Sequence, residues 1–377
     1  MGRSEPPRMA ILGAGPVGLE AALHASKAGF LFRVYERGKI GENPRHWGHV
    51  RLFTPLGMNV SPLGRAALQG MNPREPLPGD QEILTGREYV ARYLEPLAQS
   101  PALASQIETG VTVLAVGRKG MLQEELLPDA KRAGHPFRLL LRGADGKERV
   151  EEADIVLDCT GTYPHGRFLG DGGIPAAGEL SARGQILCGL EDILGEKASH
   201  FADRTTLVIG GGFSAATSVV LLAQLAKKHP SSWIVWLARR SGSQPVRRVM
   251  NDALRERDLL AARANSLATR GEGHVEFHPG TWVESVEQEK DGLTVHARVG
   301  STLRRWTVDR IIANVGYQPD RRLLSELPDN EPNYFVLGMK SLGRSSNFLL
   351  QEGFAQVREV FSQLTGKPET SYHRAGR

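Results

Sequence analysis

The sequence predicts an α/β protein with two parallel β-sheets, and two pairs of segments predict it. In residues 9–22 ("MAILGAGPVGLEAA") and 205–217 ("TTLVIGGGFSAAT"), a short apolar run enters a glycine-rich turn and a helix-like stretch follows. In residues 153–163 ("ADIVLDCTGTY") and 308–320 ("VDRIIANVGYQPD"), an apolar strand again ends at a glycine. Strands that alternate with helices in this way are typical of parallel sheets.

The composition excludes several classes of protein. The 377 residues are 40% hydrophobic and 24% charged, which suits a globular chain with about two domains. The net charge of +5 is not concentrated in one basic run, so we expect no nucleic-acid partner. The eleven histidines contain no H-E-x-x-H motif, so we expect no metal site. We expect no membrane attachment and a cytoplasmic location, because neither a signal-peptide core nor a run of about 18 apolar residues occurs.

The first glycine turn has the pattern G-x-G-x-x-G at the end of a predicted buried strand. Gly13 permits the tight turn, Gly15 lets a pyrophosphate approach the backbone, and Gly18 lets the next helix pack close to the strand. We expect that helix over residues 16–28, with Pro16 in its first turn and Gly29 as its stop. The amides at its start suit a diphosphate.

The next predicted strand, "FLFRVYE", ends at Glu36, with Arg37 beside it. A carboxylate at this position accepts hydrogen bonds from a ribose diol and repels a 2′-phosphate. The order of strand, turn, helix, strand and acid predicts a dinucleotide without a 2′-phosphate. The alternative is an α/β unit that has a glycine turn and binds nothing.

The second turn, Gly210 to Ala215, fits the G-x-G-x-x-A variant of the motif. Gly210 and Gly212 take the roles of the first two glycines, and a helix is expected over residues 214–228. Phe213 and Ser214 stand where this helix begins, so they are candidate contacts for the second nucleotide.

The strand after this second turn ends in two arginines rather than an acid. Arg239 and Arg240 supply bidentate donors that fit a 2′-phosphate, which favours NADPH over NADH. Arg247 and Arg248 could reach the same phosphate. The alternative is that Arg239 and Arg240 are solvated loop charges. The two turns therefore predict two different nucleotides, FAD at the first and NADPH at the second.

The strand–glycine segments at 153–163 and 308–320 resemble the paired "ATG" segments of the two-dinucleotide-binding-domain flavoproteins, the superfamily of thioredoxin reductase and the flavin-containing monooxygenases. Residues 45–55 ("RHWGHVRLFTP") and 334–358 are most similar to a group of bacterial FAD-dependent, NAD(P)-binding oxidoreductases. The resemblance implies that Thr160, Gly161 and Gly316 lie at the cofactors. It also makes a homodimer a common arrangement.

The superfamily implies two Rossmann-like, three-layer ββα domains. We expect a discontinuous FAD domain, residues 1–165 and 309–377, with the NADPH domain inserted at 175–305. We also expect a helix at 85–98 that begins with a capping box of Thr85 and Glu88. Further expectations are strands at 110–118, 136–143 and 148–157, a β-hairpin at 292–308 and an amphipathic helix at 347–364.

The chain departs from the family pattern at Gly338 and Met339, where relatives carry an aspartate after the glycine. That aspartate holds the ribityl chain in the relatives, so backbone amides, or Lys340 and Ser341, would have to replace the contact. Lys340, Arg344 and the start of the last helix are candidates for stabilising reduced flavin, which is anionic. The helix start adds Asn347 and Phe348 to the expected cofactor contacts, and the stretch after Glu36 makes His46, Trp47 and Arg51 candidates for the substrate side.

These features predict an enzyme that transfers hydride from NADPH to FAD and then reduces an unidentified small acceptor. Cys159 and Cys188 form no C-x-x-C pair, which makes a dithiol mechanism an inferior explanation. A flavin-dependent monooxygenase is the main alternative, although the chain lacks an F-x-G-x-x-x-H-like signature before its second turn. A nucleotide-binding redox sensor without turnover is the third reading.

Overall fold

The chain forms two units that alternate along the sequence. The computed structural model describes residues 6–69, 71, 76–125, 129–271, 274–343 and 348–367. The first unit comprises Met1–Gly48, Thr54–Thr162 and Pro319–Arg377, and the second comprises His49–Phe53 and Tyr163–Gln318. The short segment His49–Phe53 therefore belongs with the second unit, which the sequence did not indicate.

The first unit is built on a parallel sheet of five strands in the order β16-β7-β1-β2-β3. A second, antiparallel sheet contains β4, β5 and β6. Residues 148–157, expected as one strand, divide at Asp154 into a strand of each sheet. The strands are β1 (Arg8–Leu12), β2 (Leu31–Glu36), β3 (Ile107–Thr109), β4 (Thr112–Arg118), β5 (Phe137–Arg142), β6 (Glu148–Ala153), β7 (Ile155–Asp158) and β16 (Tyr334–Val336).

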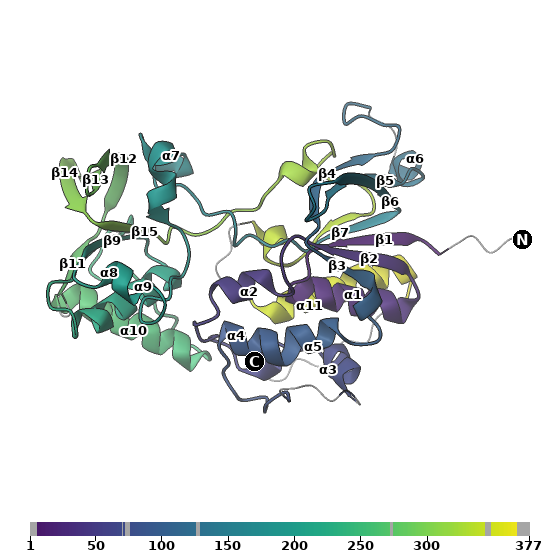
Figure 1. Cartoon of the computed structure of the whole chain (residues 1–377), viewed down its shortest axis with the longest axis horizontal. Helices are drawn as coiled ribbons and strands as arrows, with labels where there is room; N and C mark the ends of the chain where they lie inside the picture. Colours follow the sequence, from purple (N-terminus) through teal and green to yellow (C-terminus); the bar gives the residue numbers. More distant parts are fainter. Residues whose placement is uncertain are drawn as a thin grey trace, which may run out of the picture. The chain divides into compact units, whose positions relative to one another are not determined.

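The parallel sheet of the first unit lies between helices and the antiparallel sheet (Figure 1). Leu12 and Val156 pack with Leu139 and Leu141 of β5 in one buried cluster. The opposite face carries α1 (Pro16–Ala28) and α11 (Leu350–Thr365), which contact each other. These are the three layers that the superfamily resemblance implies.

Shorter helices complete the first unit. Thr85 and Glu88 form the expected capping box, so that prediction is confirmed. The helix expected at 85–98 is present, but a π-helical turn at Val90–Leu94 interrupts it between α4 and α5. The remaining elements are α2 (Glu42–His46), α3 (Pro62–Leu68), α4 (Gly86–Tyr89), α5 (Glu95–Ala98), α6 (Asp129–Ala133) and the 3₁₀ turns η1 (Leu56–Met58), η3 (Ala104–Gln106), η7 (Arg322–Leu324) and η8 (Gly338–Leu342).

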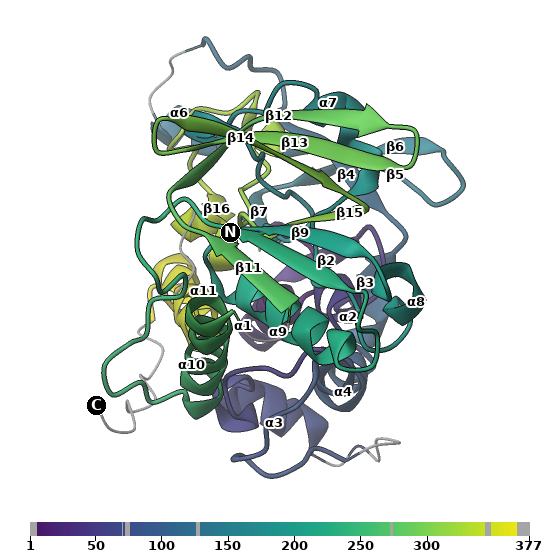
Figure 2. The same ribbon diagram turned by 90° about the vertical axis from the view of Figure 1, so that its left-hand side faces the viewer.

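The second unit repeats the plan of the first. Its parallel sheet has the order β11-β10-β9-β15-β8, and its antiparallel sheet contains β12, β13 and β14 (Figure 2). Alternate residues of β9 face opposite layers, because Val208 packs with α9 and α10 while Leu207 packs with β12 and β13. The elements are β8 (Ile186–Leu187), β9 (Thr205–Ile209), β10 (Trp233–Leu237), β11 (Val275–His278), β12 (Thr281–Glu289), β13 (Gly292–Val299), β14 (Thr302–Val308), β15 (Arg310–Ala313), α7 (Glu179–Ala182), α8 (Ala198–Phe201), α9 (Phe213–Ala226), α10 (Arg255–Arg270) and the 3₁₀ turns η4 (Asp171–Gly173) and η5 (Arg183–Gln185).

Most expected boundaries hold to within two residues. Helix α1 has the predicted bounds, and Gly29 ends it in the left-handed conformation at φ 77°. The last helix starts later than expected, because α11 begins at Leu350 and Phe348 precedes it. Among the described residues, no helix is both long and apolar enough to cross a lipid bilayer.

Candidate nucleotide sites

Two positions of the first turn require glycine, Gly13 because of its backbone conformation and Gly18 because of packing. Gly13 adopts φ +98°, and a Cβ added there would lie 3.0 Å from the carbonyl oxygen of Cys159. A Cβ on Gly18 would overlap the carbonyl oxygen of Gly13. The turn therefore joins β1 to α1 with no space for side chains at these two points.

Gly15 has neither constraint. Its φ of −81° is open to any residue, and a Cβ added there would meet no atom within 4 Å. The second turn shows the same contrast: a Cβ on Gly210 would overlap the Asn314 carbonyl, whereas one on Gly212 would meet nothing. A group that passes directly over Gly15 and Gly212 explains both glycines. The two turns therefore fit dinucleotides whose pyrophosphates lie there.

The helices after these turns present free backbone donors to such a phosphate. Gly15 is the N-cap of α1 and Gly212 is the N-cap of α9, and neither helix has a side-chain cap. Neither helix carries an acidic residue in its first turn. Nothing on these helix starts therefore competes with an anion for the first amide groups.

Glu36 is held at the end of β2 by the first turn itself. One carboxylate oxygen accepts the Ala14 amide at 2.8 Å and the other accepts the Gly38 amide at 2.8 Å. The residue is 7% exposed. Each oxygen retains a lone pair for a ribose hydroxyl, so the side chain can fill the role that its position predicts. Arg37 is exposed beside it.

Lys340 does not present the free cation that the sequence suggested. Its side chain is 1% exposed, and its ammonium lies 2.5 Å from Asp158 Oδ2 and 3.1 Å from Thr160 Oγ1. Asp158 is fully buried and also accepts the hydroxyl of Tyr334 at 3.1 Å. Lys340 is therefore half of a buried ion pair at the end of β7. Sequence reasoning missed Asp158, although a carboxylate ending an apolar strand was the available signal.

Gly338 and the start of α11 pack against the first turn of α1. Gly338 has φ +74°, and its Cβ position lies 3.3 Å from Val17. A Cβ on Gly353 would lie 2.7 Å from Val17 and 3.0 Å from the ring of Phe348. Met339 is half-buried in η8. Arg344 and Asn347, two further expected contacts, lie outside the described residues.

The three residues proposed for the substrate side do not form one group. His46 is 56% exposed and lies 3.4 Å from Glu42. Trp47 packs against the start of α4, because a Cβ on Gly86 would be 2.7 Å from its ring. Both residues belong to the first unit, whereas Arg51 belongs to the second. Trp47 thus has a packing role, and the substrate roles of all three residues stay predictions.

Gly161 and Gly316 lie close to the two points where the chain passes from one unit to the other, and each has different neighbours. Gly161 has φ +69°, and its Cβ position is 3.4 Å from the Asn43 amide nitrogen. Gly316 has φ +93° and accepts the Arg167 amide at 3.0 Å. Left-handed backbone at both positions explains the glycines without reference to a ligand.

The second turn has an aromatic side chain at the start of its helix. The rings of Phe213 and Phe53 meet edge to face with centroids 5.5 Å apart, and the Arg257 guanidinium lies 5.9 Å from the Phe213 ring. Phe53 comes from the short segment His49–Phe53, so that segment packs beside the second glycine turn. Ser214 is half-buried in the first turn of α9.

Arg239 and Arg240 are both exposed after β10. In the part of the chain that the structure describes, neither forms an ion pair, and Arg239 lies 5.6 Å from the ring of Trp282. Arg248 differs, because its guanidinium binds both carboxylate oxygens of Asp258 at 2.7 and 2.8 Å. Arg239 and Arg240 are therefore the better candidates for a 2′-phosphate, and Arg248 is a weaker one than its sequence position suggested.

The cysteines are separate and poorly reactive. Cys159 belongs to the first unit and Cys188 to the second. Burial raises the pKa of the Cys159 thiol far above its usual range, and the neighbouring Asp158 carboxylate adds to this rise. Burial also raises the pKa of Cys188. Neither thiol has the lowered pKa of a redox-active cysteine.

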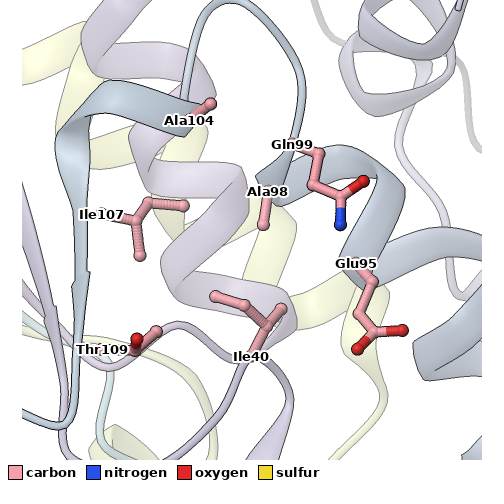
Figure 3. A pocket seen from close by; sticks show the side chains of 7 residues that line it. All are labelled: Ile40, Glu95, Ala98, Gln99, Ala104, Ile107 and Thr109. Carbon is pink, nitrogen blue, oxygen red and sulfur yellow. The ribbon is translucent and has the colours of Figure 1, made fainter.

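A depression of about 460 Å³ lies on the helical side of β3 (Figure 3). Its lining is mostly apolar, with one carboxylate, that of Glu95, which pairs with Arg45. It contains no cation that would bind a phosphate. The lining residues are Ile40, Glu95, Ala98, Gln99, Ala104, Ile107 and Thr109. We therefore do not assign either nucleotide to it.

Comparison with known proteins agrees with this architecture. No family model matches the chain. A ferredoxin–NADP reductase from Lactiplantibacillus plantarum is 22% identical over 94% of this chain and 92% of its own length. The bacillithiol disulfide reductase of Bacillus cereus has a similar structure, with a TM-score of 0.72 and 16% identity over 96% of this chain and 99% of that one.

A third similar protein performs different chemistry. The ornithine N-hydroxylase of Kutzneria sp. 744, solved with reduced FAD, NADP⁺ and L-ornithine, has a TM-score of 0.63 and 14% identity over 96% of this chain and 99% of that one. The structures of a disulfide reductase and of a hydroxylase are thus both similar to this chain over 96% of its length. The chain has the fold of the two-dinucleotide-binding-domain flavoprotein superfamily.

Proposed function

We propose that the protein is an FAD-dependent oxidoreductase that takes hydride from NADPH and passes the electrons to a small acceptor. The observation that carries this proposal is the pair of glycine turns, each with one glycine that neither packing nor backbone conformation requires. Two open positions of this kind, one per unit, suit two dinucleotides. The named reductase and hydroxylase relatives support the same pair of cofactors.

The first unit suits FAD. Glu36 offers carboxylate lone pairs to a ribose diol and would repel a 2′-phosphate. Gly15 and the start of α1 offer space and amide donors for the diphosphate. When bound there, FAD supplies the capacity to accept a hydride and release its electrons singly or in pairs. The protein contributes binding, orientation and an electrostatic environment.

The second unit suits NADPH. Gly212 offers the corresponding space for a pyrophosphate, and the exposed guanidinium groups of Arg239 and Arg240 can bind a 2′-phosphate. We further propose a cytoplasmic location, because the two cysteines are free thiols, as is usual in a reducing compartment.

Removing both cysteines should leave the reductase activity intact. We expect the Cys159→Ala, Cys188→Ala variant to oxidise NADPH with ferricyanide as acceptor within about twofold of the wild-type rate, because neither thiol is available as a thiolate. The measurement is kcat per bound flavin. A loss of kcat of about tenfold or more, with normal flavin content, would show that a cysteine carries electrons.

An acceptor screen tests the proposed reaction against the monooxygenase alternative. NADPH oxidation would be followed anaerobically with quinones, ferric chelates and low-molecular-weight disulfides as acceptors. Turnover of any of them without oxygen supports the reductase. NADPH oxidation that occurs only with oxygen, together with transfer of an oxygen atom to an added amine, would make the protein a hydroxylase like the Kutzneria relative.

A further inference from the structure

We infer that Lys340 binds the diphosphate of FAD and that Asp158 positions it for this contact. The inference rests on the proposed FAD site of the first unit. Three observations carry it: where the ion pair lies, how completely it is buried, and which hydrogen bond it leaves unmade.

The ion pair lies at the edge of the sheet where the first glycine turn begins. Asp158 ends β7 and is paired in register with Leu12, the last residue of β1. On its other side β7 pairs with β16, which Lys340 follows by four residues. In open α/β sheets, ligands bind at this carboxyl edge of the parallel strands. The glycine turn also packs against the residue that follows Asp158, since the Cβ position of Gly13 is 3.0 Å from the carbonyl oxygen of Cys159.

Burial of this pair is hard to explain by stability alone. Asp158 is fully buried and the Lys340 side chain is 1% exposed. Removing two charges from water costs about as much as their attraction returns, so an apolar pair of the same volume would hold the fold equally well. Contact with a ligand at this edge of the sheet would explain why the chain keeps both charges here.

The Asp158 carboxylate has a full set of hydrogen-bond donors, whereas the Lys340 ammonium lacks one acceptor. Asp158 accepts four: the amide and hydroxyl of Thr160 on Oδ1, and Tyr334 and Lys340 on Oδ2. An ammonium has three N–H donors. Lys340 uses two of them, on Asp158 and Thr160, and no third acceptor lies within reach among the residues that the structure describes. An oxygen of the FAD diphosphate would accept the third.

This assignment also accounts for the departure at Met339. The superfamily's aspartate after the glycine is absent, but one residue later the chain carries a lysine. A carboxylate can only accept hydrogen bonds, whereas an ammonium can donate one to a phosphate. Asp158, Thr160 and Tyr334 act through Lys340: they fix the ammonium at the end of β7, so they are positioning residues.

The test separates binding from folding. Lys340→Met alone would leave Asp158 as an unpaired buried charge and could unfold the protein, so the decisive variant is Asp158→Asn with Lys340→Met, which removes both charges. We expect its apoprotein to melt within about 5 °C of the wild type. We expect its Kd for FAD, from quenching of flavin fluorescence, to rise about 10- to 100-fold, as for a lost charged hydrogen bond.

ADP identifies the part of FAD that is contacted, because it carries phosphates and no flavin. As a competitor of FAD, ADP should lose affinity for the double variant by a factor similar to that for FAD. Unchanged FAD affinity in the folded variant would overturn the inference and make the pair structural. Loss of FAD affinity with unchanged ADP affinity would also overturn it. If the wild-type apoprotein bound no FAD, the proposed function itself would fail.

Two further variants keep the test decisive. Asp158→Asn with Lys340→Gln replaces the ion pair by two amides that can hydrogen-bond to each other, so it serves if the methionine variant does not fold. We expect its Kd for FAD to rise as well, because a neutral amide donates a weaker hydrogen bond to a phosphate than an ammonium does. The control is the buried ion cluster of Arg118, Arg132 and Glu331. Glu331 comes just before β16, so this cluster lies at the opposite edge of the sheet from Lys340. Arg132→Met with Glu331→Gln should lower the melting temperature and leave the Kd for FAD within about twofold.

Discussion

Replacing Gly15 by valine is expected to give a folded protein that binds no flavin. A Cβ added at this position meets no atom within 4 Å and the backbone conformation is permitted, so we expect the free energy of unfolding to change by less than about 1 kcal/mol. The same side chain would fill the space through which the diphosphate must pass. We expect the Kd for FAD to rise by more than about 1,000-fold, because backbone approach to both phosphates is blocked.

Flavin content after purification and the melting temperature of the apoprotein measure the two effects separately. Gly18→Ala is the matched control, because its Cβ would overlap the Gly13 carbonyl and should destabilise the fold itself. Gly212→Val should give the reciprocal result, a yellow protein that NADPH does not reduce. A Gly15→Val protein with a full complement of FAD would show that the diphosphate does not cross this turn.

Replacing Arg239 and Arg240 by alanine should abolish the preference for NADPH. Bidentate guanidinium–phosphate bonds are worth about 1.5–3 kcal/mol each, so we expect the KM for NADPH to rise about 100-fold or more. The KM for NADH should stay within about twofold, since NADH has no 2′-phosphate. Steady-state kinetics with both coenzymes measure this ratio.

Arg248→Ala provides the comparison for this pair. Because the Arg248 guanidinium is bound to Asp258, its removal should raise the KM for NADPH by less than about threefold. Equal increases for NADPH and NADH in the Arg239 and Arg240 variant would mean that these arginines bind no 2′-phosphate. An effect of Arg248→Ala as large as that of the pair would move the phosphate site into the following loop.

Local sequence signals predict the glycine turns and the elements beside them well. Helix α1 is bounded as predicted, because Pro16 and Gly29 act within one turn of its ends. Signals were weaker where tertiary packing sets the boundary. The π-helical turn at Val90–Leu94 has no sequence signature, and α11 begins at Leu350 rather than at the polar residues before it.

Contacts between distant residues could not be predicted in the same way. Asp158 and Lys340 are 182 positions apart, and only the pairing of β7 with β16 brings them together. The lysine alone therefore looked like a free cation. The pairing of Arg248 with Asp258 and the packing of Phe53 on Phe213 likewise depend on the folded second unit. The sequence indicated which chemistry to expect, but not which charges the protein itself neutralises.

The most direct test of two cooperating dinucleotide sites is anaerobic stopped-flow mixing of the purified protein with NADPH, followed through the visible absorbance of oxidised flavin. We expect the protein to be yellow, NADPH to bleach it rapidly and NADH to do so much more slowly at equal concentration. A protein without flavin, or a bound flavin that neither coenzyme reduces, would contradict it.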